Sequence, residues 1–322
     1  MNILVIGQGA MGLLWYHHIS QLLESDREYN NAQLHLLPSN RPTSDSSASN
    51  NPNTPSAHYS FTDKNNIEHH GIMHYAQVEN IQITDVILLC VKSFQISTAI
   101  ANISSTLQKH TSIILAHNGL GTLTELPKSI IGKHNIYSLL TTHGCFRSAP
   151  LTITHTGIGI TDIGLVSGVT NLVQQQSLTQ LLNTALPIVK YHKEIKQKQW
   201  VKLAINCVIN PLTAIYDVNN GQIAKSKYLQ KKMAVLKEVI AVASVEGVEL
   251  ELEGLQRTVE NVAQATATNS SSMRCDVLAN RKSEIDYING YIHRLGIEHN
   301  IATPENTKMW QAVKNLEHKY LT

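Results

Sequence analysis

The sequence of 322 residues has little charge and no long apolar run. Charged residues make up 16% of it and the formal net charge is +2, so neither nucleic acid nor a membrane surface is indicated as a partner. No apolar run approaches the length needed to span a bilayer. The opening MNILVIGQGAMG has neither a basic segment nor a signal-peptide cleavage site. We therefore expect a cytoplasmic protein that binds neither nucleic acid nor membranes.

Metal and redox motifs are also missing. There is no Cys-x-x-Cys pair and no His-Glu-x-x-His motif, although sixteen histidines are present. His70 and His74 are four residues apart, but on the strand expected there their side chains would lie roughly 13 Å apart. Cys90 and Cys207 lie in apolar runs, where cysteine behaves as a small hydrophobic residue. We expect no metal site, and a reducing compartment.

A glycine-rich turn follows the first predicted strand, Asn2 to Ile6, and leads into a predicted helix from Leu13 to Leu23. Strand, turn and helix are the context that a dinucleotide-binding GxGxxG motif requires. The N–H groups at the start of such a helix bind the cofactor's phosphates. A purely structural glycine turn is the alternative. The predicted cofactor-binding residues are Gly7, Gln8, Gly9, Ala10, Met11 and Gly12.

The second predicted strand, Gln33 to Leu37, has no acidic residue after it. An enzyme that uses NAD usually has an Asp or Glu here to bind the ribose 2′-hydroxyl. This chain continues as Pro38-Ser39-Asn40-Arg41, and Arg41 can pair with a 2′-phosphate. The pattern favours NADP, unless Arg41 is only a loop charge.

Two further polar residues follow predicted buried strands. Lys92 follows Val86 to Val91, and Asn118 follows Ser112 to Ala116. Ligands of open α/β sheets collect at the carboxyl ends of the strands, so both residues are candidates for binding cofactor or substrate. A surface lysine and a turn asparagine are the plainer alternatives.

The order of predicted elements indicates an α/β half followed by an all-α half. Pro38 to Ser60 is rich in Ser, Asn and Pro and is predicted to be a surface loop. After His192 only helices are expected, so we place the boundary near Lys193, with domains 1–193 and 194–322. Two hairpins are predicted in the first half. The first pairs Tyr59–Thr62 with Ile67–Tyr75 and is followed by a further short strand. The second pairs Thr152–His155 with Gly159–Ile163. The predicted helices are Ser97–Leu107, Leu172–Leu186, Glu194–Ile209, Lys227–Glu246, Glu253–Ala267, Asn280–Leu295 and Pro304–Lys319.

A polar stripe runs along one of these helices. Lys202, Asn206 and Asn210 recur at every fourth position, with apolar residues between them. Residues at this spacing share one face of a helix. A lysine can donate a proton and two amides can orient a small polar substrate. A kink or break is expected at Pro211, which lacks an N–H. In the alternative reading Lys202 extends to water and the amides cap the broken helix.

Two polar segments lie further along the predicted helical half. Asn269 to Met273 is a polar loop whose hydroxyls can cap the next helix or bind an anion. Glu284 is predicted to lie on a helix. In the plainer alternatives, the serines only cap the helix and Glu284 is simply a solvent-exposed residue.

Together these segments resemble the ketopantoate reductase (2-dehydropantoate 2-reductase) family over nearly the whole chain. The matching strings are GQGAMG, the strand end at Lys92, HNGLGT, KLAINCVINPLTA, SSM, EIDYING and PEN. The resemblance implies a Rossmann NADP-binding domain joined to a helical domain. It also implies an NADPH-dependent oxidoreductase that reduces 2-dehydropantoate to (R)-pantoate in pantothenate (vitamin B5) and coenzyme A biosynthesis.

The resemblance also implies roles for individual residues. Lys202 is the expected catalytic acid, and Glu284 organises the site and contributes to cofactor binding. Lys92 and Asn118 also bind cofactor. The expected substrate-binding residues are Asn118, Lys202, Asn206, Asn210 and Ser272. Where the family often has an arginine for the 2′-phosphate this chain has Pro38, with Arg41 slightly later.

Two alternative functions remain open. The chain can be an NADP-dependent dehydrogenase of another 2-keto or 3-hydroxy acid, or a non-catalytic NADP-sensing protein. The complete set of Lys202, Asn206, Asn210 and Glu284 argues against the sensor. A monomer or a homodimer is expected.

Overall fold

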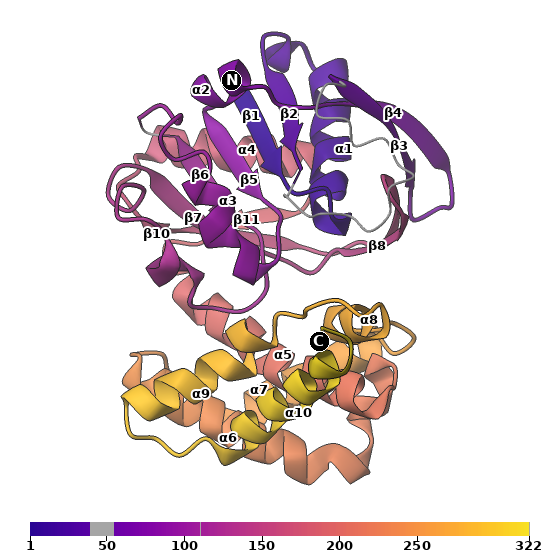
Figure 1. Cartoon of the computed structure of the whole chain (residues 1–322), viewed down its shortest axis with the longest axis vertical. Helices are drawn as coiled ribbons and strands as arrows, with labels where there is room; N and C mark the ends of the chain where they lie inside the picture. The colour runs from indigo at the N-terminus through magenta and orange to yellow at the C-terminus, as the bar shows by residue number, and fades with distance from the viewer. Residues whose placement is uncertain (39–54, 110, 322) are drawn as a thin grey trace. The chain divides into compact units, whose positions relative to one another are not determined.

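The computed structural model describes residues 1–38, 55–109 and 111–321, which form two compact units (Figure 1). The first unit comprises Met1–Val91, Gln95–His117 and Glu125–Ile195. The second comprises Lys92–Phe94, Asn118–Thr124 and Lys196–Thr322. The short segments Lys92–Phe94 and Asn118–Thr124 thus belong to the second unit, although each follows a strand in the first part of the chain.

The first unit is built on a seven-stranded sheet with the order β11-β10-β7-β6-β5-β1-β2. Strands β2, β1, β5, β6 and β7 are parallel, β10 is antiparallel to β7, and β11 is parallel to β10. All four residues of β5 are buried, as expected for a central strand covered on both faces. The strands are β1 (Asn2–Ile6), β2 (Gln33–Leu37), β5 (Val86–Leu89), β6 (Ser112–Leu115), β7 (Asn135–Thr141), β10 (Thr161–Ser167) and β11 (Val189–Tyr191).

Helices cover this sheet. Helix α1 (Ala10–Ser25) packs against α4 (Leu172–Ala185), and their apolar residues share one core with alternate residues of the sheet. The shorter elements of this part of the chain are α2 (Val78–Gln82), α3 (Ile96–Ala101) and the 3-10 turns η1 (Arg27–Tyr29), η2 (Ser93–Gln95) and η3 (Thr122–Glu125). The predicted short strand after the first hairpin is therefore wrong, because Val78–Gln82 is helical, and the helix predicted to reach Leu107 ends at Ala101.

A second sheet, with the order β4-β3-β9-β8, packs against α1. The predicted first hairpin is confirmed, although β3 begins at Ser56, inside the predicted loop; residues 39–54 of that loop lie outside the described residues. The predicted second hairpin is wrong. Strand β9 pairs with β8 and β3, whereas β10 belongs to the seven-stranded sheet. The strands are β3 (Ser56–Thr62), β4 (Glu68–His74), β8 (Gly144–Ala149) and β9 (Thr152–Gly157).

Four histidines are buried or half-buried between α1 and the second sheet. His17 stacks on Phe61 with ring centroids 3.8 Å apart, and His143 Nδ1 lies 3.1 Å from His155 Nε2. Burial lowers the pKa of His17 to about 4 and, with the neighbouring His17, that of His18 to about 3. Burial likewise lowers the pKa of His143 to about 4. These imidazoles are therefore neutral parts of the core, and no group of three or more His, Cys, Asp or Glu in the described residues is arranged to hold a metal ion.

Helices build the described part of the second unit around one apolar core. None of the helices in the described ranges is long and apolar enough to cross a membrane. The prediction of an α/β half followed by a helical half is confirmed. The helices are α5 (Lys196–Tyr216), α6 (Leu229–Val245), α7 (Leu252–Ala265), α8 (Ser272–Leu278), α9 (Asn289–Glu298) and α10 (Pro304–Leu321), with 3-10 turns η4 (Asn220–Ala224), η5 (Ser226–Tyr228) and η6 (Ile285–Tyr287).

A kink or break was expected at Pro211, and a break is not found, because helix α5 continues through it to Tyr216. Proline removes the N–H that would bond to the carbonyl of Cys207. The side chain of Asn289 replaces it: Asn289 Nδ2 donates to Cys207 O at 3.0 Å, and also to Asn306 Oδ1 at 3.0 Å. Because Asn289 and Asn306 are fully buried, this bond satisfies a carbonyl that water cannot reach.

We predict that stability falls as the pH drops below about 6.5. The unfolded chain takes up protons on these histidines near pH 6.5. Burial lowers their pKa in the folded chain, to about 4 for His17 and His143 and to about 3 for His18. Each of these three therefore costs up to about 1.4 kcal/mol per pH unit between its folded pKa and pH 6.5. The measurement is the urea midpoint from pH 7.5 to pH 5. His18→Phe should flatten the slope, and His58→Ala, at an exposed histidine on β3, should not. A wild-type midpoint that stays constant down to pH 5 contradicts the prediction.

We also predict that Asn289→Leu lowers the free energy of unfolding by about 1–3 kcal/mol, because it leaves the Cys207 carbonyl buried and unsatisfied. The same substitution at Asn315, which is exposed on α10, is the matched control and should have little effect. Equal urea midpoints for the Asn289 variant and the wild type would show that the bond does not support the helix at Pro211.

Candidate functional site

In the first unit, the turn from Gly7 to Gly12 has the geometry of a dinucleotide-binding turn. Gly7 has a φ of +105°, and a Cβ there would lie 2.7 Å from the carbonyl oxygen of Cys90. A Cβ on Gly12 would lie 1.9 Å from the carbonyl oxygen of Gly7. Packing within the protein therefore requires glycine at both positions, because a side chain would collide with the residues after β5 at Gly7 and with the turn itself at Gly12.

Gly9 differs from the other two glycines. A Cβ built on it meets only the Cys90 carbonyl oxygen, at 3.9 Å, which is an ordinary contact. Protein packing thus leaves room for a side chain at the N-cap of α1. A small residue at this position has a reason only if a ligand approaches the backbone closely, as the pyrophosphate of a dinucleotide does. The turn therefore fits such a cofactor.

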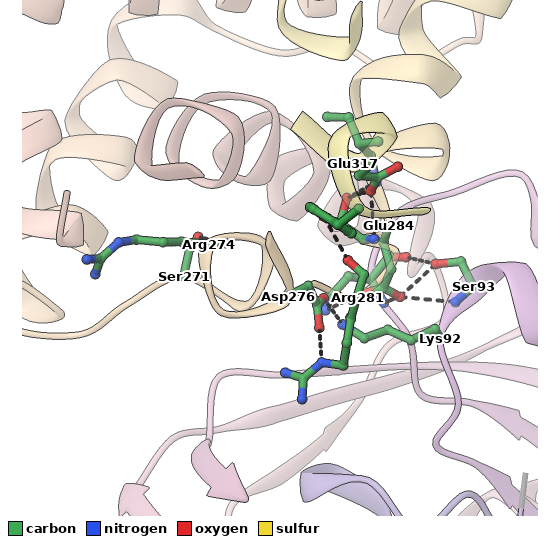
Figure 2. Close-up of polar contacts among 12 residues, drawn as sticks. Lys92, Ser93, Ser271, Arg274, Asp276, Arg281, Glu284 and Glu317 are labelled. Atoms are coloured by element: carbon green, nitrogen blue, oxygen red, sulfur yellow. Dashed lines mark hydrogen bonds and ion pairs between the residues drawn. The ribbon is translucent and has the colours of Figure 1, made fainter. Parts of the chain in front are cut away.

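In the second unit, the Glu284 carboxylate joins two separate loop segments (Figure 2). The backbone N–H of Ser93 donates to Glu284 Oε1 at 3.1 Å, and that of Asn118 donates to the same oxygen at 3.3 Å. The side-chain amide of Asn118 donates to Oε2 at 3.1 Å. The Ser93 hydroxyl lies 2.7 Å from Oε1 and 2.6 Å from the Asn118 carbonyl oxygen, so its single proton serves one of these two acceptors. Glu284 is 4% exposed, so these donors replace the water that its charge has lost.

Lys92 adds an ammonium group to this cluster. Its Nζ lies 2.6 Å from Asp276 Oδ2 and 3.5 Å from Glu284 Oε2, and Figure 2 shows Lys92 and Asp276 pointing toward one another. Arg281 Nε lies 3.3 Å from the other Asp276 oxygen. Burial acts to lower the pKa of Lys92, but the Glu284 and Asp276 carboxylates outweigh it and raise that pKa above its usual value. Lys92 is therefore a cation held by two carboxylates.

A second buried carboxylate fixes the chain next to Glu284. The backbone N–H and the hydroxyl of Ser283 both lie 2.7 Å from Glu317 Oε1, on α10, and Glu317 is 1% exposed. Glu284 itself is not on a helix, contrary to the expectation, but at the N-cap position of η6. The predicted single helix from Asn280 to Leu295 is therefore wrong, because its first part is the bend that presents Glu284.

The polar stripe of α5 is present in the second unit. Lys202 and Asn206 are half-buried, Asn210 is 7% exposed, and the residues between them are largely buried. The Asn206 Nδ2 atom is buried without a hydrogen-bond partner in the structure. A buried amide nitrogen without an acceptor is costly unless something occupies its place, and a ligand oxygen is one such group.

The serines near α8 divide into two roles. Ser271 is the N-cap, one of the two roles expected for the hydroxyls of this loop, and its Oγ accepts from the N–H of Arg274 at 3.0 Å. Ser272 is the first residue of α8 and is exposed. Figure 2 places Ser271 and Arg274 away from the Lys92–Asp276 pair. Ser271, and not Ser272, therefore caps α8.

The structure brings Lys92, Asn118 and Glu284 together and places Lys202, Asn206 and Asn210 along one helix. Arg41 lies outside the described residues. Sequence reasoning missed Ser93, Asp276 and Arg281. Asp276 had a signal, because it follows the Asn269–Met273 loop as an acid in a helix that is otherwise free of acids.

Family models match almost the whole chain. The model described as "Ketopantoate reductase PanE/ApbA" matches residues 3–168, and "Ketopantoate reductase PanE/ApbA C terminal" matches residues 194–317. A 2-dehydropantoate 2-reductase from Vibrio cholerae serotype O1 is 32% identical over 325 residues, covering 99% of each chain. The protein of that name from Escherichia coli O157:H7 is 40% identical over 245 residues, covering 74% of this chain and 76% of its own length.

Solved structures share the fold. A PanE/ApbA family ketopantoate reductase from Ralstonia eutropha JMP134 matches with a TM-score of 0.83 at 22% identity, covering 100% of both chains. D-mandelate dehydrogenase with NADH and anilino(oxo)acetate matches with a TM-score of 0.84 at 20% identity, also covering 100% of both. At these identities the likeness concerns the fold alone. The two family matches and the full-length likeness to the Vibrio cholerae protein show that this chain belongs to the ketopantoate reductase family.

Proposed function

We propose that this chain reduces the ketone of 2-dehydropantoate to the alcohol of (R)-pantoate with NADPH, in the cytoplasm, in the biosynthesis of pantothenate and coenzyme A. The observation that carries the proposal is the stripe of Lys202, Asn206 and Asn210 on α5, in which the Asn206 amide nitrogen is buried without a partner. The relatives named 2-dehydropantoate 2-reductase support the choice of substrate.

Lys202 is the proposed catalytic acid. When bound, the reduced nicotinamide supplies a hydride to the carbonyl carbon of the substrate. Negative charge then develops on the carbonyl oxygen, and the Lys202 ammonium neutralises it by donating a proton, so that hydride and proton together convert C=O to CH–OH. The Lys202 side chain is only half-buried, so solvent can return the proton after each turnover.

The amides and the hydroxyl orient the substrate in this proposal. Asn206 Nδ2 requires an acceptor, which a carboxylate or hydroxyl oxygen of a 2-keto acid provides. Asn210, Asn118 and Ser272 are the further proposed substrate contacts. Glu284 holds the backbone of Asn118 and shares the Lys92 ammonium, and so sets the charge of the site.

The cofactor is proposed to bind through Gly7–Gly12 with help from Lys92, Asn118 and Glu284. NADPH is preferred over NADH in this proposal because no acid follows β2, and Arg41 is the proposed partner of the 2′-phosphate. A related ketopantoate reductase from Staphylococcus aureus is described as dimeric, and a monomer or homodimer is proposed here.

The proposal is tested by NADPH oxidation with 2-dehydropantoate, pyruvate and 2-ketoisovalerate, repeated with NADH. The highest kcat/KM is expected for 2-dehydropantoate with NADPH. A higher value for another acid would favour a dehydrogenase of that acid, and binding of NADPH without turnover of any acid would favour a sensor. Arg41→Ala should raise the KM for NADPH more than the KM for NADH. Equal effects on both would show that Arg41 does not bind the 2′-phosphate.

Lys202 and Glu284 are expected to act as one unit. Lys202→Ala should lower kcat by about 10²–10⁴-fold, as loss of a general acid does, and Glu284→Gln should also lower it. The double variant should cost much less than the two losses combined, because each residue needs the other.

Lys198→Ala is the matched control for Lys202, since Lys198 is exposed one turn earlier on α5. It should leave kcat unchanged. Glu284→Gln keeps the size of the buried side chain, so circular dichroism separates a folding defect from a catalytic one. Near-normal turnover in Lys202→Ala would refute its role as the acid.

A further inference from the structure

The polar stripe of α5 continues beyond Asn210 to Thr213. Thr213 follows Asn210 by three residues and Asn206 by seven, so the three side chains share one face of the helix. Thr213 differs from the other two in being fully buried. A fully buried hydroxyl does not contact a substrate, so the role of Thr213 has to follow from the groups that it bonds to.

The Thr213 hydroxyl joins α5 to the start of α8, which packs against it. Its Oγ1 lies 2.7 Å from the Oγ of Ser271, the N-cap of α8. It also lies 2.8 Å from the carbonyl oxygen of Ile209 and 2.9 Å from that of Asn210. Ser271 Oγ in turn accepts from the N–H of Arg274. Thr213 and Ser271 are both buried, so solvent competes little for these bonds.

The two hydroxyl protons can all be used in this chain of bonds. Each hydroxyl carries one proton and can also accept, whereas a carbonyl oxygen only accepts. Donation from Ser271 to Thr213 leaves the Thr213 proton for the carbonyl oxygen of Ile209 or Asn210. Removal of the Thr213 hydroxyl would take this buried partner from Ser271, and a buried polar group that loses its partner is costly. The cap therefore depends on Thr213.

The cap sets the place of Ser272. Ser271 has an extended backbone, with φ −63° and ψ 154°, and Ser272 is the first residue of the helix that follows. The bond from the Arg274 N–H to Ser271 Oγ closes the first turn around Ser272. Because Thr213 bonds to this cap and also to the carbonyl of Asn210, it connects two residues that are proposed to contact the substrate.

A second set of bonds attaches the same segment to the end of α5. The Arg274 Nε donates to Asp217 Oδ1 at 2.9 Å. Its Nη1 donates to Asn219 Oδ1 at 2.6 Å and to Ser270 Oγ at 3.2 Å. These bonds do not involve Thr213, so the segment stays attached when the Thr213 hydroxyl is removed. The loss should therefore alter the cap without unfolding the loop.

We propose that Thr213 is a positioning residue for the substrate, which sets the place of Ser272 relative to Asn210 through the Ser271 cap. The proposal rests on the substrate contacts that the proposed function gives to Ser272 and Asn210. Thr213 itself touches no substrate and lies outside the proton transfer assigned to Lys202. It should therefore affect the binding of the substrate and not the chemical step.

The test is the KM and kcat for 2-dehydropantoate at saturating NADPH. Thr213→Val keeps the branched shape and loses the hydroxyl, so KM should rise about two- to ten-fold, the range that one hydrogen bond contributes, while kcat stays the same. Thr213→Ser keeps the hydroxyl and should restore most of the wild-type KM. The Kd of NADPH, followed by fluorescence, should not change.

A double variant tests whether Thr213 acts through the cap. Ser271→Ala should also raise KM. The variant that combines Thr213→Val with Ser271→Ala should raise KM no further than the larger of the two single effects, because both changes break the same chain of bonds. Single effects that multiply in the double variant would show independent roles and would contradict the proposal.

Thr258→Val is the matched control. Thr258 is also a helical threonine of the second unit, and its Oγ1 donates to the carbonyl oxygen of Gly254, four residues earlier, at 2.7 Å. Thr213 has the same spacing to Ile209, but the Thr258 hydroxyl has no bond to a helix cap within the described ranges. KM and kcat should stay unchanged in Thr258→Val, and melting curves should show that all variants are folded at the assay temperature.

The outcomes separate this proposal from the proposed function. An unchanged KM in Thr213→Val, while the wild type turns over 2-dehydropantoate, would overturn only the role of Thr213. A fall in kcat without a change in KM would also overturn it, because Thr213 would then act on the chemical step. A wild type that does not reduce 2-dehydropantoate with NADPH would overturn both the proposed function and this proposal.

Discussion

The carboxylate of Glu284 is the group on which the arrangement of the second unit depends. A buried charge is tolerated only where hydrogen bonds and opposite charges replace its lost water. Here the replacements come from the backbone of Ser93 and Asn118 and from the Lys92 ammonium. These donors belong to two loops that follow β5 and β6, so the need to satisfy one carboxylate attaches both loops to the helical unit. The Glu284 carboxylate thus both holds Lys92 and Asn118 in place and attaches the two loops that carry them.

The residues of each candidate site are in turn held in place by other buried groups. Glu317 holds Ser283 and thereby the bend that presents Glu284, and Arg281 shares the Asp276 carboxylate that binds Lys92. Asn289 satisfies the carbonyl that Pro211 leaves open, and so keeps α5 continuous through the end of its polar stripe. In the first unit the collisions that a Cβ would cause at Gly7 and Gly12 fix the turn, whereas a Cβ at Gly9 would make only an ordinary contact.

Local patterns in the sequence predicted those features that are set by residues close together in the chain. The strand–turn–helix at Gly7–Gly12 and the spacing of Lys202, Asn206 and Asn210 needed only the periods of strand and helix, and both are found. Pairings between distant segments were not accessible in this way. The strands β9 and β10 follow one another closely but join different sheets, and the helix at Pro211 continues because Asn289, far along the chain, supplies the missing donor. Asp276 was missed because its partner, Lys92, is 184 residues away.

The most direct measurement of the central claim is hydrogen exchange at individual backbone amides, followed by NMR in the wild type and in Glu284→Ala. The amides of Ser93 and Asn118 donate to the Glu284 carboxylate, so each reports on that bond itself. Both amides should exchange slowly in the wild type and become fast in the variant, while the buried amides of α6 and of the central strand β5 keep their protection. Protection of Ser93 and Asn118 that is the same in both proteins would contradict it.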